Sequence, residues 1–128
     1  MRSQLKSCLP LLVIMSLLSA ACSAHKRAAS TDPNVITLEQ IQERHFTNAY
    51  DVVAALRPNW LHARGTDSFQ APGQVLVYYD NMRMGGVESL RTITTPTIIE
   101  IRHFDGIAAT TRWGLDHGQG VIQVSSHR

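Results

Sequence analysis

The chain has 128 residues, which is enough for one domain and too short for two. Twelve lysines and arginines stand against ten aspartates and glutamates, and no basic patch indicates a nucleic-acid partner. Both cysteines, Cys8 and Cys22, lie near the N-terminus, so we expect the folded part to contain no disulfide.

Residues 1–21 have the pattern of a secretory signal peptide. Arg2 and Lys6 precede an apolar run at 9–18, and small residues follow at 19–21. The run is shorter than the ~20 apolar residues that span a bilayer. An uncleaved membrane anchor is the alternative. Loss of residues 1–21 removes two basic residues, so the mature chain has ten basic and ten acidic side chains.

The signal ends in Leu18-Ser19-Ala20-Ala21-Cys22, which resembles the lipobox of bacterial lipoproteins. This resemblance implies that Cys22 becomes the lipidated first residue. The alternative is ordinary cleavage before Cys22, which would leave an unpaired thiol in an exported protein. Ser23 stands where an aspartate retains such lipoproteins at the inner membrane, so the resemblance implies an outer-membrane lipoprotein that faces the periplasm. Residues 22–36 are small and polar and predict a flexible tether.

Two helices are predicted next. Thr37 and Gln40 form a capping-box pattern, so a helix should begin at Leu38 and continue toward His45. A second helix is predicted at 48–56, where four apolar residues form one stripe that ends before Pro58. We expect Trp60 and Leu61 to fold back onto the domain and residues 64–73 to form a loop.

A hairpin follows, and then residues 98–124, which we call the closing unit. Residues 75–79 are apolar on both faces, which is typical of a central strand, and 82–84 are the expected return strand, ended by Gly85-Gly86. Residues 87–93 predict a short helix. From 98 to 124 we expect a strand in which Ile99 and Ile101 are buried, a turn at Asp105-Gly106, a helix at 108–113 ended by Gly114, a glycine-rich loop and a strand at 121–124.

Three of these pieces, in this order, resemble the plug domain of TonB-dependent outer-membrane receptors. NAYDVVAALRPNW at 48–60 is similar to the early plug helix, VLVYYDNMRMGG at 75–86 to the central hairpin, and 98–124 to the closing strand unit. The resemblance covers roughly residues 37–126 and departs from the family at Asn81, at His103-Phe104 and at 118–120. It implies a small α+β plug-like domain at 37–128, with a mixed sheet of short strands and two or three short helices.

A receptor barrel would require many further strands of about 9–11 residues each. The chain has no such strands after residue 126, so we expect a free-standing plug-like domain without the barrel.

The candidate binding surface is Arg112 with Trp113, joined by Asp116 and His117, because tryptophan and arginine are enriched at binding hot spots. The alternative is that Trp113 packs across the sheet while Arg112 pairs with Glu100 or Asp116. His103 and His117 flank the closing unit and could meet in space as metal ligands. No histidine motif supports a metal, and we expect solvated or hydrogen-bonded imidazoles instead.

We therefore expect a non-enzymatic envelope lipoprotein that acts by protein–protein contact at the outer membrane. The expected partner is a barrel subunit or another envelope protein, and no cofactor is expected. The alternative is a small-ligand-binding periplasmic module, which needs an apolar pocket of about 300 Å³ or more. An enzyme would need an acid, base or nucleophile cluster that the sequence does not show. A third interpretation, a decaying receptor gene, would give an unstable domain. The complete alternation of residues 75–79 and 121–124 argues against this interpretation.

Overall fold

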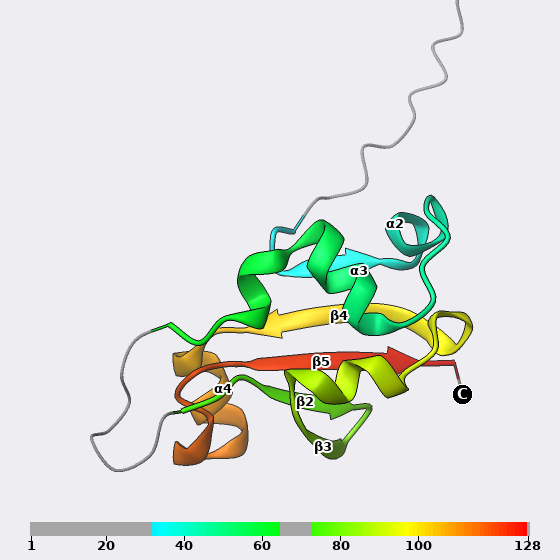
Figure 1. Ribbon diagram of the computed structural model, residues 1–128. Coiled ribbons are helices and arrows are strands. Elements are labelled where there is room, and N and C mark those ends of the chain that lie inside the picture. The colour runs from blue at the N-terminus through cyan, green and yellow to red at the C-terminus, as the bar shows by residue number, and fades with distance from the viewer. Residues whose placement is uncertain (1–31, 65–72, 128) are drawn as a thin grey trace, which may run out of the picture. The chain divides into compact units, whose positions relative to one another are not determined.

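Alternating apolar residues build five short strands, which join into one mixed sheet in the computed structural model (Figure 1). The structure describes residues 32–64 and 73–127. The sheet order is β1-β4-β5-β2-β3; β2 and β5 are parallel, and the other neighbours are antiparallel. The strands are β1 (Val35–Thr37), β2 (Leu76–Tyr79), β3 (Met82–Gly86), β4 (Ile98–Phe104) and β5 (Val121–Ser126).

Short helices connect the strands, so the predicted α+β class with a mixed sheet is confirmed. The α-helices are α2 (Leu38–Gln42), α3 (Ala49–Leu56) and α4 (Gly106–Trp113). The 3-10 helices are η1 (Pro58–Leu61), η2 (Val87–Thr92), η3 (Thr95–Thr97) and η4 (Leu115–His117). No helix in the described part of the chain is both long and apolar enough to cross a bilayer.

The predicted signal peptide, Cys22, most of the predicted tether and most of the loop predicted at 64–73 lie outside the described residues. The end of the predicted tether is part of the domain, because Val35 and Ile36 belong to β1 and are buried. β1 pairs antiparallel with β4 at the sheet edge. The folded domain therefore begins slightly earlier than residue 37.

The two predicted helix starts agree with the structure. The Thr37 backbone N–H donates to Gln40 Oε1 at 3.2 Å, as a capping box requires, and Asn48 Oδ1 accepts from the Asp51 N–H at 3.0 Å. α2 is shorter than expected, because it ends at Gln42 and does not reach His45. α3 ends at Leu56, before Pro58, as predicted.

The main core lies between one face of the sheet and the helical layer formed by α2, α3, η1 and η2. Trp60 folds back into it as predicted, with 2% of its surface exposed. Val77 from β2, Ile101 from β4 and Ile122 from β5 point into the same core and are fully buried. Successive side chains of a regular strand point to opposite faces, so the other face of the sheet remains for a second layer.

α4 covers part of that other face and forms a second, smaller core. Leu76 and Tyr78 of β2 and Val121 of β5 are buried there against Ala109 of α4, with Trp113 beside them. β2 is therefore covered on both faces, as its continuous apolar sequence predicts. It also lies between β5 and β3 within the sheet.

The β2–β3 hairpin and β4 each contain an irregularity in strand pairing, and at both places the structure differs from the prediction. β3 continues through Gly85 and Gly86 instead of ending there, because Gly85 adopts a φ of +117° beside an irregularity in the β2–β3 pairing. In β4 the pairing shifts between Ile98 and Glu100. This shift turns Ile98 and Ile101 into the core and leaves Ile99 half-buried, so the predicted burial of Ile99 is wrong.

Two close backbone approaches position α4. A Cβ atom on Gly106 would overlap the carbonyl oxygen of Gly118, and one on Gly120 would lie 2.7 Å from the Phe104 carbonyl oxygen. Gly120 also has a φ of +97°, which side-chain-bearing residues rarely adopt. The close approach expected of Gly120 is confirmed, whereas at Gly118 it is Gly106 that must lack a side chain. Gly106, predicted in a turn, instead begins the helix.

Replacement of Ile98 by alanine should lower the free energy of unfolding by about 2–5 kcal/mol, because it leaves a cavity in the main core. Ile99→Ala is the matched control and should cost less than half as much, since Ile99 is only half-buried. Urea unfolding measures both. Equal losses would contradict the bulge that exchanges the two side chains.

Candidate functional site

α4 and η4 carry the predicted binding residues. Asp105 is the N-cap of α4, and its Oδ1 accepts from the Ala108 N–H at 2.7 Å. Gly114 ends the helix with a φ of +105°, as predicted. η4 then turns the chain back toward β5, so residues 112–117 lie at the end of α4.

Trp113 packs inward. Its ring stacks on Tyr78, with ring centroids 5.1 Å apart, and meets Phe104 edge-on at 5.1 Å. This position agrees with the alternative expectation, in which Trp113 packs across the sheet. Most of the tryptophan surface is therefore used within the domain.

His117 is buried beside the same aromatic rings and has only 4% of its surface exposed. Its Nδ1 lies 3.1 Å from the Gly114 carbonyl oxygen, and its Nε2 lies 2.9 Å from the Tyr78 hydroxyl. A carbonyl can only accept, so Nδ1 carries the hydrogen, and in the neutral ring Nε2 accepts from Tyr78. His117 thus ties η4 to β2 and does not reach the surface.

Arg112 and Asp116 are exposed, so the structure does not bring the four predicted residues into one surface. The Arg112 guanidinium lies 4.7 Å from the Trp113 ring centroid and 5.2 Å from that of Phe104. The expected pairing of Arg112 with Glu100 is not made. Glu100 Oε1 instead accepts from Arg102 Nε at 3.0 Å.

Sequence reasoning missed two exposed apolar residues on this segment. Ile107 is 83% exposed and Leu115 is 90% exposed. A signal was available, because a helix that turns Ala109 and Trp113 inward must turn Ile107 away from the sheet. We call Arg112, Leu115 and Asp116, at the end of α4, the α4–η4 surface, whereas Ile107 lies at the start of the helix.

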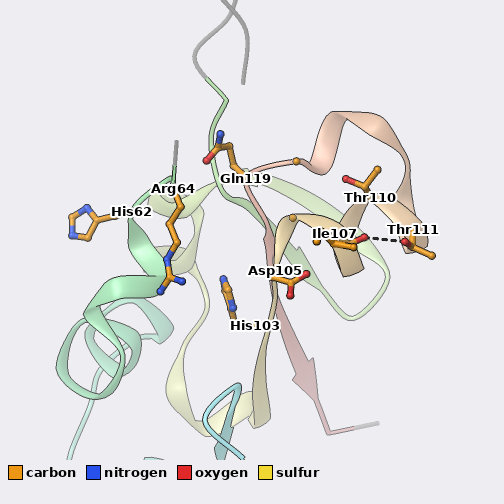
Figure 2. Close-up of a pocket in the computed structure, with 10 residues that line it drawn as sticks. His62, Arg64, His103, Asp105, Ile107, Thr110, Thr111 and Gln119 are labelled. Atoms are coloured by element: carbon orange, nitrogen blue, oxygen red, sulfur yellow. Dashed lines mark hydrogen bonds between the residues drawn. The ribbon is translucent and has the colours of Figure 1, made fainter. Parts of the chain in front are cut away.

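A pocket of about 640 Å³ lies beside the start of α4 (Figure 2). Three segments that are distant in the sequence contribute: the chain after η1, the end of β4 with the start of α4, and the turn before β5. No periodic pattern in the sequence predicts that these three segments meet. The lining residues are His62, Arg64, His103, Asp105, Gly106, Ile107, Thr110, Thr111, Gly118 and Gln119.

His103 occupies the centre of the pocket wall. Its ring stacks on Trp60, with centroids 5.2 Å apart and planes 17° apart. Burial, and secondly the positive charge of Arg64, lower the pKa of His103 from its ordinary value, although the Asp105 carboxylate acts in the opposite direction. The imidazole is consequently neutral near pH 7.

His103 and His117, the pair considered as possible metal ligands, lie on opposite faces of the sheet. His103 contacts Trp60 of the main core, whereas His117 contacts Tyr78 on the face that α4 covers. Within residues 32–64 and 73–127, no three histidine, cysteine, aspartate or glutamate side chains are grouped to hold a metal ion. Comparison of the chain with protein-family models, curated proteins and solved structures gave no match.

Tyr78→Phe should lower the free energy of unfolding by about 1–3 kcal/mol, because it leaves His117 Nε2 buried without its partner. Tyr79→Phe, on the same strand, removes a hydroxyl from a partly exposed residue and should change stability by about 0.5 kcal/mol or less. Urea unfolding of both variants at one pH gives the comparison. Similar losses in the two would show that the Tyr78–His117 contact adds nothing.

The lowered pKa of His103 makes stability depend on pH. The unfolded chain binds a proton near the ordinary value of 6.5 while the folded protein resists it, so the free energy of unfolding should fall as the pH drops below that value. His103→Gln should flatten this dependence. His45→Gln, at an exposed position, should leave it unchanged. Unfolding curves from about pH 7.5 to about pH 5.5 test this expectation. An unaltered slope in His103→Gln would contradict it.

Proposed function

We propose that this chain is a non-enzymatic lipoprotein of the bacterial outer membrane, and that its domain acts by protein–protein contact. The proposal combines the plug-like order of its sequence pieces, the signal peptide and the lipobox resemblance at Cys22. The proposed partner is an outer-membrane barrel or another envelope protein, reached from the periplasmic side. Nucleic acid and cofactors have no part in it.

The observation that carries the contact function is the exposure of Leu115. This side chain is 90% exposed at the end of α4, between Gly114 and Asp116, and Arg112 lies one turn before it. An exposed leucine and an exposed arginine near the same helix end offer apolar area and a charged planar group. Both residues belong to the closing unit at 98–124, which is the longest piece of the plug-like pattern.

The rigidity of the closing unit supports the same function. Beneath the α4–η4 surface, Trp113 is stacked on Tyr78 and His117 is hydrogen-bonded to Tyr78. A surface on a fixed support loses little conformational entropy when it binds. The internal contacts of His117 also occupy both of its ring nitrogens, which supports a structural role for this histidine over proton transfer.

The second candidate is a small-ligand-binding module, because the pocket beside α4 has a volume of about 640 Å³. This exceeds the lower limit of ~300 Å³ for a typical small-molecule site. Its lining combines the apolar Ile107 with cationic and polar groups. The pocket and Leu115 are separate features, so the two functions can be tested separately.

Leu115→Asp should reduce partner recovery without unfolding the domain, because the side chain is 90% exposed. Full-length protein would be captured from detergent-solubilised envelopes of its native host and its partners identified by mass spectrometry. We expect the variant to recover a specific outer-membrane protein about tenfold less well than the wild type, the loss typical of a moderate hot spot. Cys22→Ser should weaken recovery as well, because it removes the proposed anchor.

Met82→Asp is the matched control, since Met82 is 67% exposed on β3, away from the α4–η4 surface. It should leave recovery unchanged. Equal recovery by wild type and Leu115→Asp, with both folded, would overturn the proposed contact. So would equal losses in Leu115→Asp and Met82→Asp, because these would indicate a general effect of charge.

A further inference from the structure

We propose that the pocket beside α4 binds a small organic anion, with a carboxylate or phosphate head toward Arg64 and His103 and an apolar body against Ile107. This inference extends the second candidate function. It is independent of the protein contact at Leu115. The pocket opens at the start of α4, where side chains from three separate segments of the chain converge (Figure 2).

The proposed anion-binding side of the pocket is formed by the Arg64 guanidinium and the His103 imidazole. The Arg64 guanidinium points toward the His103 ring, close enough for its charge to lower the pKa of that histidine (Figure 2). Neither of the two ion pairs in the described part of the chain involves Arg64. An anion can bind an arginine and an imidazole that face the same space. The planar guanidinium group can bind two oxygens of a carboxylate or phosphate at once.

The position of His103 is fixed before any ligand arrives. Its ring stacks on the buried Trp60, and its backbone N–H donates to the Asn34 carbonyl oxygen at 2.8 Å. A Cβ atom on Gly120 would lie 3.4 Å from His103 Nε2, so a side chain at this position would crowd that nitrogen. The ring therefore stands at a defined position in the pocket wall, which reduces the entropy lost on binding.

The opposite side of the pocket favours an apolar body. Ile107 is 83% exposed there, and Thr110 and Thr111 lie beside it on α4. The Thr111 hydroxyl donates to the Ile107 carbonyl oxygen at 2.9 Å, so it is already hydrogen-bonded within the helix. The Asp105 carboxylate lies between His103 and Ile107 in Figure 2 and disfavours an anionic group against Ile107. The head of the ligand is thereby directed to Arg64 and the body to Ile107.

Binding should take up a proton. The charged and titratable groups around His103 are Arg64 and Asp105, with His62 at the rim of the same pocket. An anion beside the ring favours the protonated imidazole and offsets the effect of Arg64. The affinity should consequently rise as the pH is lowered from about 7.5 to about 5.5, through the ordinary titration range of histidine.

The test is an NMR titration of full-length protein in detergent, with isotope-labelled histidines and with hexanoate, hexyl phosphate, acetate and inorganic phosphate as probes. We expect saturable shifts of the His103 resonance with hexanoate or hexyl phosphate and a raised His103 pKa in the complex. The two six-carbon probes distinguish a carboxylate head from a phosphate head. Acetate and inorganic phosphate should bind more weakly, because they lack the apolar body.

Arg64→Gln should weaken binding of the better probe by about tenfold or more, as expected for the loss of one charge-assisted hydrogen bond. Arg83→Gln, an exposed arginine on β3 outside the pocket, is the matched control and should bind like the wild type. The proposal is overturned if no probe saturates the His103 shift, if the two variants weaken binding equally, or if the small inorganic and acetate probes bind as tightly as the six-carbon ones. Partner recovery by Arg64→Gln should remain intact, which separates this result from failure of the contact at Leu115.

Discussion

The last strand of the chain lies at the centre of the sheet, and the rest of the structure depends on its pairing. β5 is antiparallel to β4 and parallel to β2, so without it the sheet separates into the pairs β1–β4 and β2–β3. Isolated two-stranded pieces are marginally stable at best. β5 also joins the two cores, because Ile122 faces the main core and Val121 faces α4. The Asp80 carboxylate holds the far end of β5, accepting from both the backbone N–H and the hydroxyl of Ser126.

Local chemistry allowed most elements to be predicted. The capping box at Thr37, the stop before Pro58 and the glycine at the end of α4 each depend on residues within one or two helical turns. Local patterns could not predict the features that depend on long-range packing. The bulge in β4 reverses the expected roles of Ile98 and Ile99, because pairing with β5 decides which residue faces the core. Periodicity assumes a regular strand and has no means of detecting this shift.

The same limit applies to the candidate site. Arg112, Trp113, Asp116 and His117 are neighbours in sequence, yet the structure divides them between the surface and the interior, because Tyr78 from a distant strand takes Trp113 and His117 as partners. The pocket is still less visible from sequence, since Arg64, His103 and Gln119 are separated by long stretches of chain. Their meeting depends on the absence of side chains at Gly106 and Gly120, where any Cβ atom would press against backbone carbonyls.

α4 supports both proposed sites, and its contacts determine how these sites relate. An isolated helix of eight residues would not be stable in water, so tertiary contacts fix its position. Gly106 lies against the backbone of Gly118 at one end, and Trp113 is held between Tyr78 and Phe104 at the other. For a ligand beside Ile107 and a partner at Leu115 to affect each other's binding, α4 would need two arrangements. The ligand and the partner would each have to bind one arrangement more tightly than the other. Because both ends of α4 are held, the helix acts as a rigid support, and the structure favours two sites that bind independently.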